Sequence, residues 1–312
     1  MGQGAPAGAK VTFSFFAPRN LAVNVLGDFT KWRPEPMQRD ARGWWWCARH
    51  LPDGGYGYRF QVLSVTPGSE GQWVNVTDLR APCLPGDGSA NCICIVDGRV
   101  CSSGYVWRHD DAPLALDGSL AEARLMPDSA CFGGAAPSCC AVIEALDEMA
   151  ACGVRALIVP CVSTTPAIGY DVRHPFFPAA EYVERDSFKR MVDECHSRGL
   201  RVVVEMEALQ GDPAGTLAQI DYGYWYRMPP RAVPNVHAAP PRFDYHRKDE
   251  QRGIFPAREF RRACLFHWID TYHIDGVRFV GITSEAERGF LAQLGDEARA
   301  RVTVKPFHTQ VG

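Results

Sequence analysis

Residues 186–205, DSFKRMVDECHSRGLRVVVE, contain one complete step from a helix to a strand. Asp186 and Ser187 are both suitable N-cap residues, and Gly199 is of the type that commonly ends a helix. Between these positions the apolar side chains recur every three or four residues, at Phe188, Met191, Val192 and Cys195. The β-branched run that follows at 201–205 is short and predicts a buried strand. This stretch therefore predicts one unit of an α/β fold.

The same step recurs through the second part of the chain. Helices are predicted at 140–152, at 257–272 and from a Ser284/Glu287 capping box onward, and the strands after them at 155–160, 276–281 and 301–305. Such runs form either a doubly wound sheet or a (β/α) barrel, and no glycine-rich phosphate motif follows any of these strands. The long insertion at 219–248, rich in proline and aromatic residues, is typical of the elaborated loops on active-site faces of barrels. We therefore predict an incomplete TIM-type (β/α) barrel of about five β-α units over residues 121–312.

Residues 11–98 follow a different pattern, in which short apolar runs alternate with Gly, Pro and Asp clusters. The runs are VTFSFFAP, LAVNVLGDF, GWWWCARHL, YGYRFQVL, QWVNV and CICIVDG. Their alternation sends one set of side chains into a core and leaves the other face of each sheet available. We predict an all-β, immunoglobulin-like sandwich at 11–98, after a flexible N-terminus at 1–10 and before a linker at 99–120.

Composition argues against several functional classes. With 312 residues the chain is long enough for two domains, and a net charge of −3 provides no general attraction for nucleic acid or an anionic membrane. The first ten residues lack the apolar core of a signal peptide, so we expect a cytoplasmic protein, with association to a plastid or another organelle left open. The 12 cysteines are then expected to be reduced. No spacing suits a metal site, and we expect neither a metal nor a cofactor.

Two long stretches of the second part carry a family resemblance. They are IGYDVRHPFFPAAEYVERDSFKRMVDECHSRGLRVVVE at 168–205 and RFDYHRKDEQRGIFPAREFRRACLFHWIDTYHIDGVRFVGITS at 242–284. In order and content they resemble the starch and glycogen branching enzymes of the α-amylase superfamily (glycoside hydrolase family 13), particularly the eukaryotic members. The resemblance implies a 1,4-α-glucan branching-enzyme barrel that is degenerate and truncated, because the chain ends before a sixth strand.

The stretches VLGDFTKW, YGYRFQV, GQW and SANCICIV in the first part resemble carbohydrate-binding module family 48, which precedes the barrel in branching enzymes. This resemblance implies glucan contacts at Trp32, Arg59, Trp73, Ser89 and Asn91. Aromatic rings can lie against the apolar faces of glucose, and the polar groups beside them can bind its hydroxyls. The alternative is that Trp32 and Trp73 fill the sandwich core, but their positions beside turns favour exposure. In the run at 44–46, the alternation of a strand sends at least one tryptophan inward.

The branching-enzyme resemblance also implies that catalysis is lost. Retaining glycosyl transfer needs a carboxylate nucleophile and a carboxylic acid/base about 5 to 5.5 Å apart. In the family the nucleophile Asp follows an Arg by two residues, and here Arg278 is followed by Val280. The other degenerate positions are Glu205 and Gln210 at the third strand, and Pro306 or Phe307 in place of the acid/base Glu.

Tyr170 and Arg278 match positions at which the family contacts sugar, and they imply a vestigial sugar cleft, with a packing role as the alternative. The groups that could replace the lost carboxylates are Glu205, Glu207, Asp275, Glu285 and His308. Among them Asp275 precedes its strand, which predicts a place at the stability face of the barrel.

Three functions fit these patterns. The leading prediction is a non-catalytic α-1,4-glucan-binding protein derived from a branching enzyme, with a regulatory or scaffolding role. The second is an active branching enzyme or amylase-like glycosidase that uses displaced residues, and the third is a structural subunit of a larger assembly with no sugar bound. Because five β-α units leave an unpaired sheet edge, we also expect a protein partner, a homo-oligomer contact or the N-terminal domain to cover it.

Overall fold

A computed structural model of the chain describes residues 8–81, 91–101, 105–109, 121–125, 138–160, 175–178, 186–229, 240–302 and 306–312. The chain forms two compact units, each of which is discontinuous in sequence. The sandwich unit comprises Met1–Gly104, Asp212–Asp244 and Asp249–Gly253. The α/β unit comprises Tyr105–Gly211, Tyr245–Lys248 and Ile254–Gly312.

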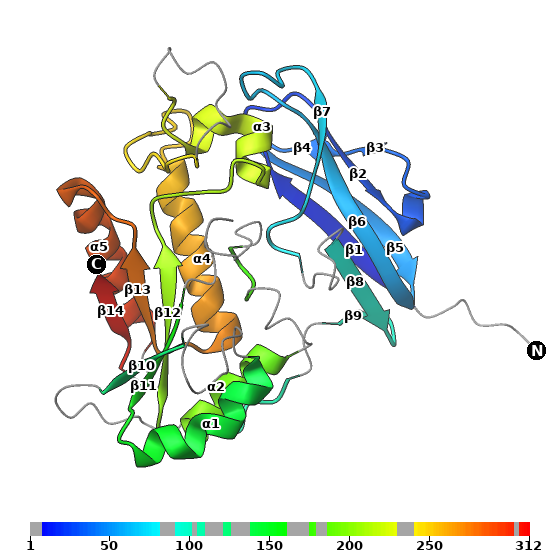
Figure 1. Cartoon of the computed structure of the whole chain (residues 1–312). Helices are drawn as coiled ribbons and strands as arrows, with labels where there is room; N and C mark the ends of the chain where they lie inside the picture. Colours follow the sequence, from blue (N-terminus) through cyan, green and yellow to red (C-terminus); the bar gives the residue numbers. More distant parts are fainter. Residues whose placement is uncertain are drawn as a thin grey trace, which may run out of the picture. The chain divides into compact units, whose positions relative to one another are not determined.

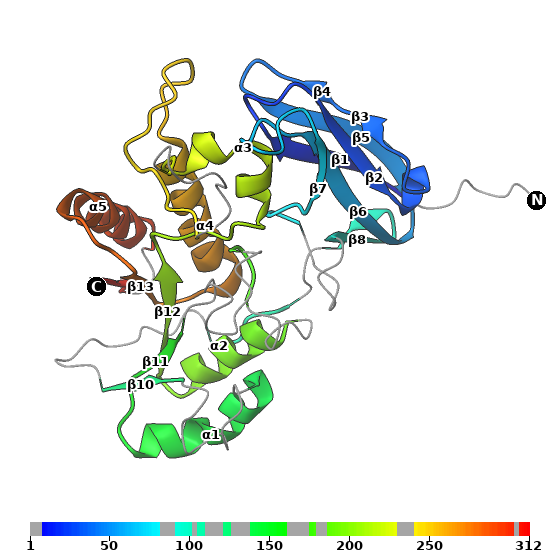
Figure 2. The ribbon, with the colours of Figure 1, turned by 45° about the horizontal axis from the view of Figure 1, so that its top comes forward.

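Two antiparallel sheets make up most of the sandwich unit (Figure 2). The first sheet has the order β1-β5-β4, formed by Gly8–Phe16, Trp44–Pro52 and Gln38–Arg39. The second has the order β3-β2-β6-β8-β9, formed by Glu35–Pro36, Val23–Gly27, Gly54–Leu63, Asn91–Val96 and Arg99–Val100, and β7 (Trp73–Val76) also pairs with β6. A short 3-10 helix, η1 (Asp28–Thr30), follows β2. The prediction of an all-β N-terminal domain is therefore confirmed.

The core of this unit lies between the sheets. Along β1 the side chains of Val11, Phe13 and Phe15 are buried, and those between them face outward. The ring centroids of Phe15 and Phe60 lie 4.7 Å apart. Ile220, from the segment Asp212–Asp244, belongs to the same cluster of buried residues. Each such apolar side chain contributes on the order of 1.5–3 kcal/mol when fully buried.

Most of the long insertion is therefore grouped with the sandwich. It contains α3 (Thr216–Trp225) and the bridge between Tyr226 and Phe243. The sequence predicts a loop on the active-site face of a barrel, whereas the structure assigns Asp212–Asp244 to the sandwich unit. One reason is that Ile220 of this segment is buried in the sandwich core.

The α/β unit contains five parallel strands in the order β10-β11-β12-β13-β14 (Figure 1). They are formed by Glu122–Arg124, Ala156–Val159, Arg201–Glu207, Gly276–Val280 and His308–Val311. The helices are α1 (Cys139–Ala151), α2 (Ser187–Ser197), α4 (Pro256–Tyr272) and α5 (Glu285–Arg301). A parallel sheet with intervening helices is thus confirmed, while closure into a TIM-type barrel of about five units stays a prediction.

The helix starts and the last strand test the local predictions. Oγ of Ser284 accepts a hydrogen bond from the backbone N–H of Glu287 at 3.3 Å, as the capping pattern predicts. Asp186 is the N-cap residue of α2, but its side chain makes no capping hydrogen bond. The final strand is His308–Val311 and not 301–305, since Arg301 ends α5 and residues 303–305 lie outside the described residues.

Two further features bear on environment. None of the helices in the described ranges has the length and apolar character needed to cross a membrane. Cys92 forms a disulfide, which departs from the expectation that all thiols are reduced. Buried cysteines are found at Cys47, Cys139, Cys195 and Cys264.

Candidate functional site

Trp32 is an exposed ring held in a defined place on the sandwich. It follows η1, and both Lys31 and Trp32 have left-handed backbone conformations, with φ of 54° and 57°. The indole Nε1 donates a hydrogen bond to Oδ1 of Asp28 at 2.9 Å, and Oδ2 of the same carboxylate accepts from the backbone N–H of Gly57 at 2.6 Å. The residue is nevertheless 44% exposed, which rules out a core-filling role. The ring is thus exposed to solvent, while its hydrogen bond to Asp28 fixes its orientation.

Gly57 on β6 makes room for this arrangement. A Cβ atom at this position would lie 3.2 Å from Oδ2 of Asp28 and 3.4 Å from Cζ2 of Trp32. The contact with Asp28 is tight, so a larger residue would require a shift of the carboxylate that holds the indole. Sequence reasoning did not find Asp28 or Gly57, although the four-residue spacing from Asp28 to Trp32 in DFTKW is a usable signal for a local side-chain hydrogen bond.

Trp73 is exposed beside the other end of β6, on the neighbouring strand β7. It begins β7, pairs with Leu63 of β6 and is 46% exposed. Along β6 the side chains of Tyr58, Phe60 and Val62 are buried, so Gly57 and Leu63 belong to the outward row. At a rise of about 3.3 Å per residue these two backbone positions are about 20 Å apart. A ligand that contacts both tryptophans therefore has to span about 20 Å.

Arg59 lies in the outward row between these two positions. It pairs with Leu26 of β2 and is only partly buried. Within the part of the chain that the structure describes, its buried Nε has no hydrogen-bond partner. A guanidinium in this place can donate to sugar hydroxyls between the two aromatic rings. Hence Trp32, Arg59 and Trp73 form one candidate surface, which we call the β6 face.

Asn91 does not fit the predicted role of a glucan contact. It is fully buried, and its amide is occupied on both sides by the backbone of Asp78. Oδ1 accepts from the N–H of Asp78 at 2.8 Å, and Nδ2 donates to the carbonyl of Asp78 at 2.9 Å. Asp78 in turn accepts a 2.7 Å hydrogen bond from the hydroxyl of Tyr58, and burial raises the pKa of this carboxyl group. Asn91 is therefore a structural clamp, and Ser89 lies outside the described residues.

The tryptophan run on β5 divides as a strand requires. Trp45 is 7% exposed and its Nε1 donates to the carbonyl of Ala17 at 2.9 Å. Trp46 is 40% exposed and pairs with Ser14 of β1. Because Trp46 belongs to the β1-β5-β4 sheet, it is separate from the β6 face.

A polar cluster occupies one face of the parallel sheet in the α/β unit. Glu205 of β12 is 3% exposed and accepts from Nη2 of Arg124 at 2.5 Å, and its other oxygen lies 3.7 Å from Nη1 of Arg278. Arg278 also bonds Glu122 and Gln310, each at 2.6 Å. Glu122 lies on β10 and Arg278 on β13, and these two strands are not neighbours in the sheet. The cluster therefore connects strands that do not pair with each other. Glu205 is therefore engaged by two cations.

Val280 ends β13 beside Glu207 of β12, in the place where the resemblance puts a nucleophile. The carboxylate of Glu207 accepts hydrogen bonds from the backbone N–H groups of Leu209 and Gln210 at 2.9 and 3.0 Å. It also fills the space beside Gly281, where an added Cβ would lie 2.2 Å from Oε1 of Glu207. Glu207 is thus part of the turn after β12, and a valine offers no nucleophilic oxygen. Tyr170, the other predicted member of the vestigial cleft, lies outside the described residues.

Pro306 does not lie where an acid/base residue would. Pro306 precedes β14. Because Phe279 of β13 pairs with Val311 of β14, the residue opposite Val280 is Gly312. The predicted match of Pro306 or Phe307 to the acid/base Glu is therefore wrong, because it assumes a strand at 301–305. The case for lost catalysis then depends on Val280 and on Glu205, which two arginines engage.

Two of the possible replacements are distant from this strand end. Asp275 precedes β13 and is fully buried; its Oδ2 lies 2.8 Å from Nε2 of His196 and accepts from the N–H of Val202 at 2.8 Å. His308 begins β14 at the same edge, where burial is the main cause that lowers its pKa, with Arg278 acting in the same direction and Glu122 opposing it. Both lie at the amino-terminal edge of the sheet, the edge that usually serves stability.

Residues 3–79 match carbohydrate-binding module 48, the isoamylase N-terminal domain. Over 302 residues the chain is 27% identical to the 1,4-alpha-glucan branching enzyme GlgB of Bordetella parapertussis, covering 92% of this chain and 39% of that protein. It is 31% identical over 130 residues to the corresponding enzyme of Trichodesmium erythraeum, covering 41% of this chain and 16% of that protein. The chain thus spans about two-fifths of the length of the Bordetella protein. These relatives are bacterial, and a particular likeness to eukaryotic members is not confirmed.

Solved structures agree at the level of the fold. Apo pullulanase from Paenibacillus barengoltzii has a TM-score of 0.71 at 18% identity, covering 97% of this chain and 52% of that chain. Pullulanase type I from Bacillus subtilis has a TM-score of 0.65 at 16% identity, covering 97% and 46%. The chain is therefore similar to 1,4-alpha-glucan branching enzymes over most of its length, and its N-terminal part matches carbohydrate-binding module 48.

Proposed function

We propose that the protein binds α-1,4-glucan through the β6 face. The observation that carries this proposal is the pair of half-exposed tryptophans, Trp32 and Trp73, on one face of one sheet, with Arg59 between them. Exposed tryptophans are costly to leave in water and are enriched at binding sites, where their flat rings meet apolar surfaces. The match of residues 3–79 to a carbohydrate-binding module supports the same ligand class.

Binding to insoluble amylose and to glycogen tests this proposal. Wild-type protein should sediment with both polymers, and Trp32→Ala or Trp73→Ala should each reduce the affinity by about tenfold, which corresponds to 1.4 kcal/mol. Trp46→Ala is the matched control, because Trp46 has a similar exposure of 40% but belongs to the other sheet. Absence of wild-type binding, or equal losses in all three variants, would count against the β6 face.

We further propose that the described chain has no branching or hydrolytic activity of its own and acts in a regulatory or scaffolding role. Support comes from Val280 in the place of the nucleophile and from Glu205, which two arginines already engage. Amylose incubated with the protein should keep its iodine spectrum and chain-length distribution. Turnover that disappears in Glu205→Gln would instead favour an active enzyme with displaced residues.

A protein partner or a second copy of the chain is also proposed to cover the edges of the parallel sheet. In the described part of that sheet, β10 and β14 each pair with a strand on one side. Light scattering should then report an assembly larger than a monomer, and the amides of β14 should be protected from hydrogen exchange only in that assembly. A cytoplasmic location remains a prediction.

A further inference from the structure

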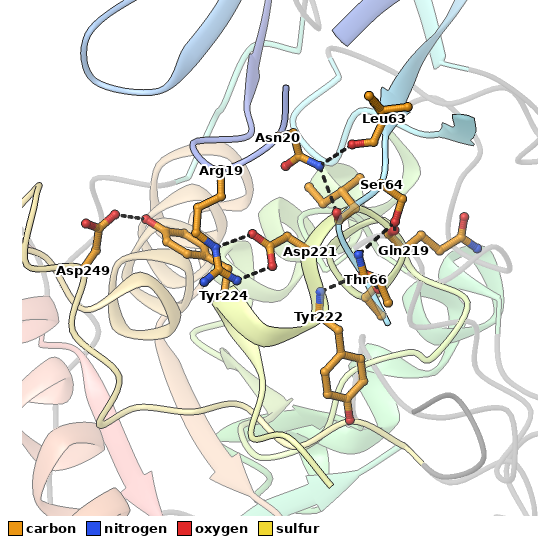
Figure 3. Close-up of polar contacts among 12 residues, drawn as sticks. Arg19, Asn20, Leu63, Ser64, Thr66, Gln219, Asp221, Tyr222, Tyr224 and Asp249 are labelled. Atoms are coloured by element: carbon orange, nitrogen blue, oxygen red, sulfur yellow. Dashed lines mark hydrogen bonds and ion pairs between the residues drawn. The ribbon is translucent and has the colours of Figure 1, made fainter. Parts of the chain in front are cut away.

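The hydroxyl of Thr66 is built into the backbone of α3. Thr66 lies in the connection between β6 and β7 and is fully buried. Its Oγ1 donates to the carbonyl of Ala218 at 2.8 Å. The same oxygen accepts from the N–H of Tyr222 at 2.8 Å (Figure 3). In an uninterrupted helix the N–H of Tyr222 would bond directly to the carbonyl of Ala218, four residues earlier. The hydroxyl is therefore inserted into the helical ladder.

This insertion explains the break in α3. Asp221 has φ of −160° and ψ of 78°, which are not helical values. Side chains that enter the ladder of backbone hydrogen bonds are a known cause of kinks. Thr66 therefore satisfies the carbonyl of Ala218 and the N–H of Tyr222, which an uninterrupted helix would pair with each other.

The neighbours of Thr66 donate hydrogen bonds to the next two carbonyls of α3. Oγ of Ser64 donates to the carbonyl of Gln219 at 2.6 Å, and the N–H of Val65 donates to the carbonyl of Ile220 at 3.0 Å. The amide of Asn20 donates to the same carbonyl of Ile220 and to that of Leu63, each at 2.9 Å. Three successive carbonyls of α3 are thus bound by the sandwich, and these contacts fix the segment along its backbone.

Ser64, which bonds α3, also bonds the residues just before β7, the strand that begins with Trp73. The N–H of Ser64 donates to the carbonyl of Gln72, next to Trp73, at 2.9 Å, and the carbonyl of Ser64 accepts from Gly71 at 2.9 Å. At the far end of β7, Oγ1 of Thr216 in α3 donates to the carbonyl of Thr77 at 3.0 Å. Both ends of β7 are therefore tied to α3, and the β6–β7 hairpin cannot shift without breaking these bonds.

From this geometry we infer that Thr66 is a positioning residue for glucan binding: by fixing the β6–β7 hairpin on α3, its hydroxyl holds Trp73 in line with Arg59 and Trp32. The inference rests on the proposed function of the β6 face. It also assigns a role to α3, which then supports the β6–β7 hairpin through its backbone and Thr216.

Thr66→Val tests the inference, because it keeps the shape of the side chain and removes the hydroxyl, while Thr66→Ser keeps the hydroxyl and is the matched control. Maltoheptaose is titrated into the whole chain and followed by tryptophan fluorescence, well below the melting temperature of every variant. Thr66→Val should weaken binding by about fivefold to tenfold, and Thr66→Ser should stay within about twofold of wild type.

A double-mutant cycle separates positioning from a general loss of stability. If Thr66 acts through Trp73, Thr66→Val should cause no further loss of affinity in a Trp73→Ala background, since coupled sites are not additive. Full additivity, or wild-type affinity of Thr66→Val, would overturn the inference while leaving the glucan site intact. Failure of the wild type to bind maltoheptaose would overturn both the proposed function and the inference.

Ser64→Ala provides a second route if Thr66→Val does not fold. It removes the hydrogen bond to Gln219 from the same connection and leaves the backbone contacts of Ser64 in place. A loss of about twofold to fourfold in maltoheptaose affinity that disappears in the Trp73→Ala background supports the inference. An unchanged affinity would contradict it.

Discussion

The guanidinium of Arg19 donates two hydrogen bonds to the carboxylate of Asp221, and so joins two residues 202 positions apart in the chain (Figure 3). The Asp221 side chain is 3% exposed and sits at the break in α3, whereas that of Arg19 is 45% exposed. The hydrogen bond to Asp221 is the main cause that raises the pKa of Arg19. A buried carboxylate is costly without a cation, so Arg19 stabilises the ionised side chain of Asp221 at the break in α3.

Arg19→Ala should lower the free energy of unfolding by about 1–3 kcal/mol, because it leaves the Asp221 carboxylate buried without its cation. The value is below that of a fully buried pair, since water can reach the exposed side of Arg19. Arg49→Ala is the control, because its partner Glu35 is itself partly exposed, and the loss there should stay below about 1 kcal/mol. Urea unfolding of the two variants should rank them in this order; equal midpoints would show that Arg19 contributes no more than a surface pair.

Asp28→Ala should weaken glucan binding by about threefold to tenfold with little change in stability. The carboxylate fixes the Trp32 indole at 2.9 Å and the Gly57 N–H at 2.6 Å, and both bonds lie at the surface. Asp28→Asn keeps an amide oxygen as an acceptor and should lie between the alanine variant and wild type. Titration with maltoheptaose and thermal melting, done in parallel, measure the two effects. Unchanged affinity of the alanine variant would mean that Trp32 needs no support from Asp28.

The pair between α4 and α5 should make stability depend on pH in a defined direction. Nε of Arg262 bonds Oε2 of Glu297 at 2.7 Å, and this hydrogen bond lowers the pKa of Glu297. An acid with a lowered folded pKa adds stability above its ordinary pKa of about 4.3, and this is lost as the pH falls through the folded value. Because both side chains are partly exposed, the increment should be below about 1 kcal/mol.

Urea unfolding from pH 7 to pH 3 measures this increment for Glu297. The difference between wild type and Glu297→Gln should be largest at neutral pH and should vanish toward pH 3. Arg262→Met should abolish the same pH-dependent part. A difference that grows as the pH falls would contradict the assigned direction.

Asp275→Ala should reduce stability strongly and leave glucan binding unchanged. The carboxylate is fully buried and serves both His196 and the backbone of Val202, so its removal leaves buried polar groups without a partner. The expected loss is about 3–5 kcal/mol. Asp270→Ala, whose partner Arg301 is exposed, is the control and should cost less than about 1 kcal/mol. A change in maltoheptaose affinity in Asp275→Ala at a temperature where it is folded would contradict a purely structural role.

Periodicity predicted much of the local structure. The helix at 186–199 and the strand at 201–205 were readable because the apolar spacing changes from a helical to a strand period at Gly199. The exposure of Trp32 and Trp73 followed from their places beside turns. The last strand was misplaced because RVTVK has the stronger β-branched pattern, whereas HTQV forms the strand through its pairing with β13.

Features that depend on distant contacts could not be predicted. Asn91 has the right chemistry for a sugar contact, but its burial against Asp78 is set by the packing of β8 against the rest of the sandwich. The place of the inserted segment depends on contacts such as that of Thr66 with Ala218, which are 152 positions apart. No local pattern in the sequence reports such pairings.

The discontinuity of the sandwich unit also sets an order of events during protein synthesis. Its last strand ends at Val100, but Ile220 of its core is made 120 residues later, after β12 of the other unit. At about 5–20 residues per second, a ribosome needs roughly 6 to 24 s to cover that distance. During this interval the nascent sandwich lacks Ile220 in its core, and Thr66 lacks its contacts with α3. Its N-terminal strands are therefore the first part to be made, yet the unit is completed only once much of the α/β unit has left the ribosome.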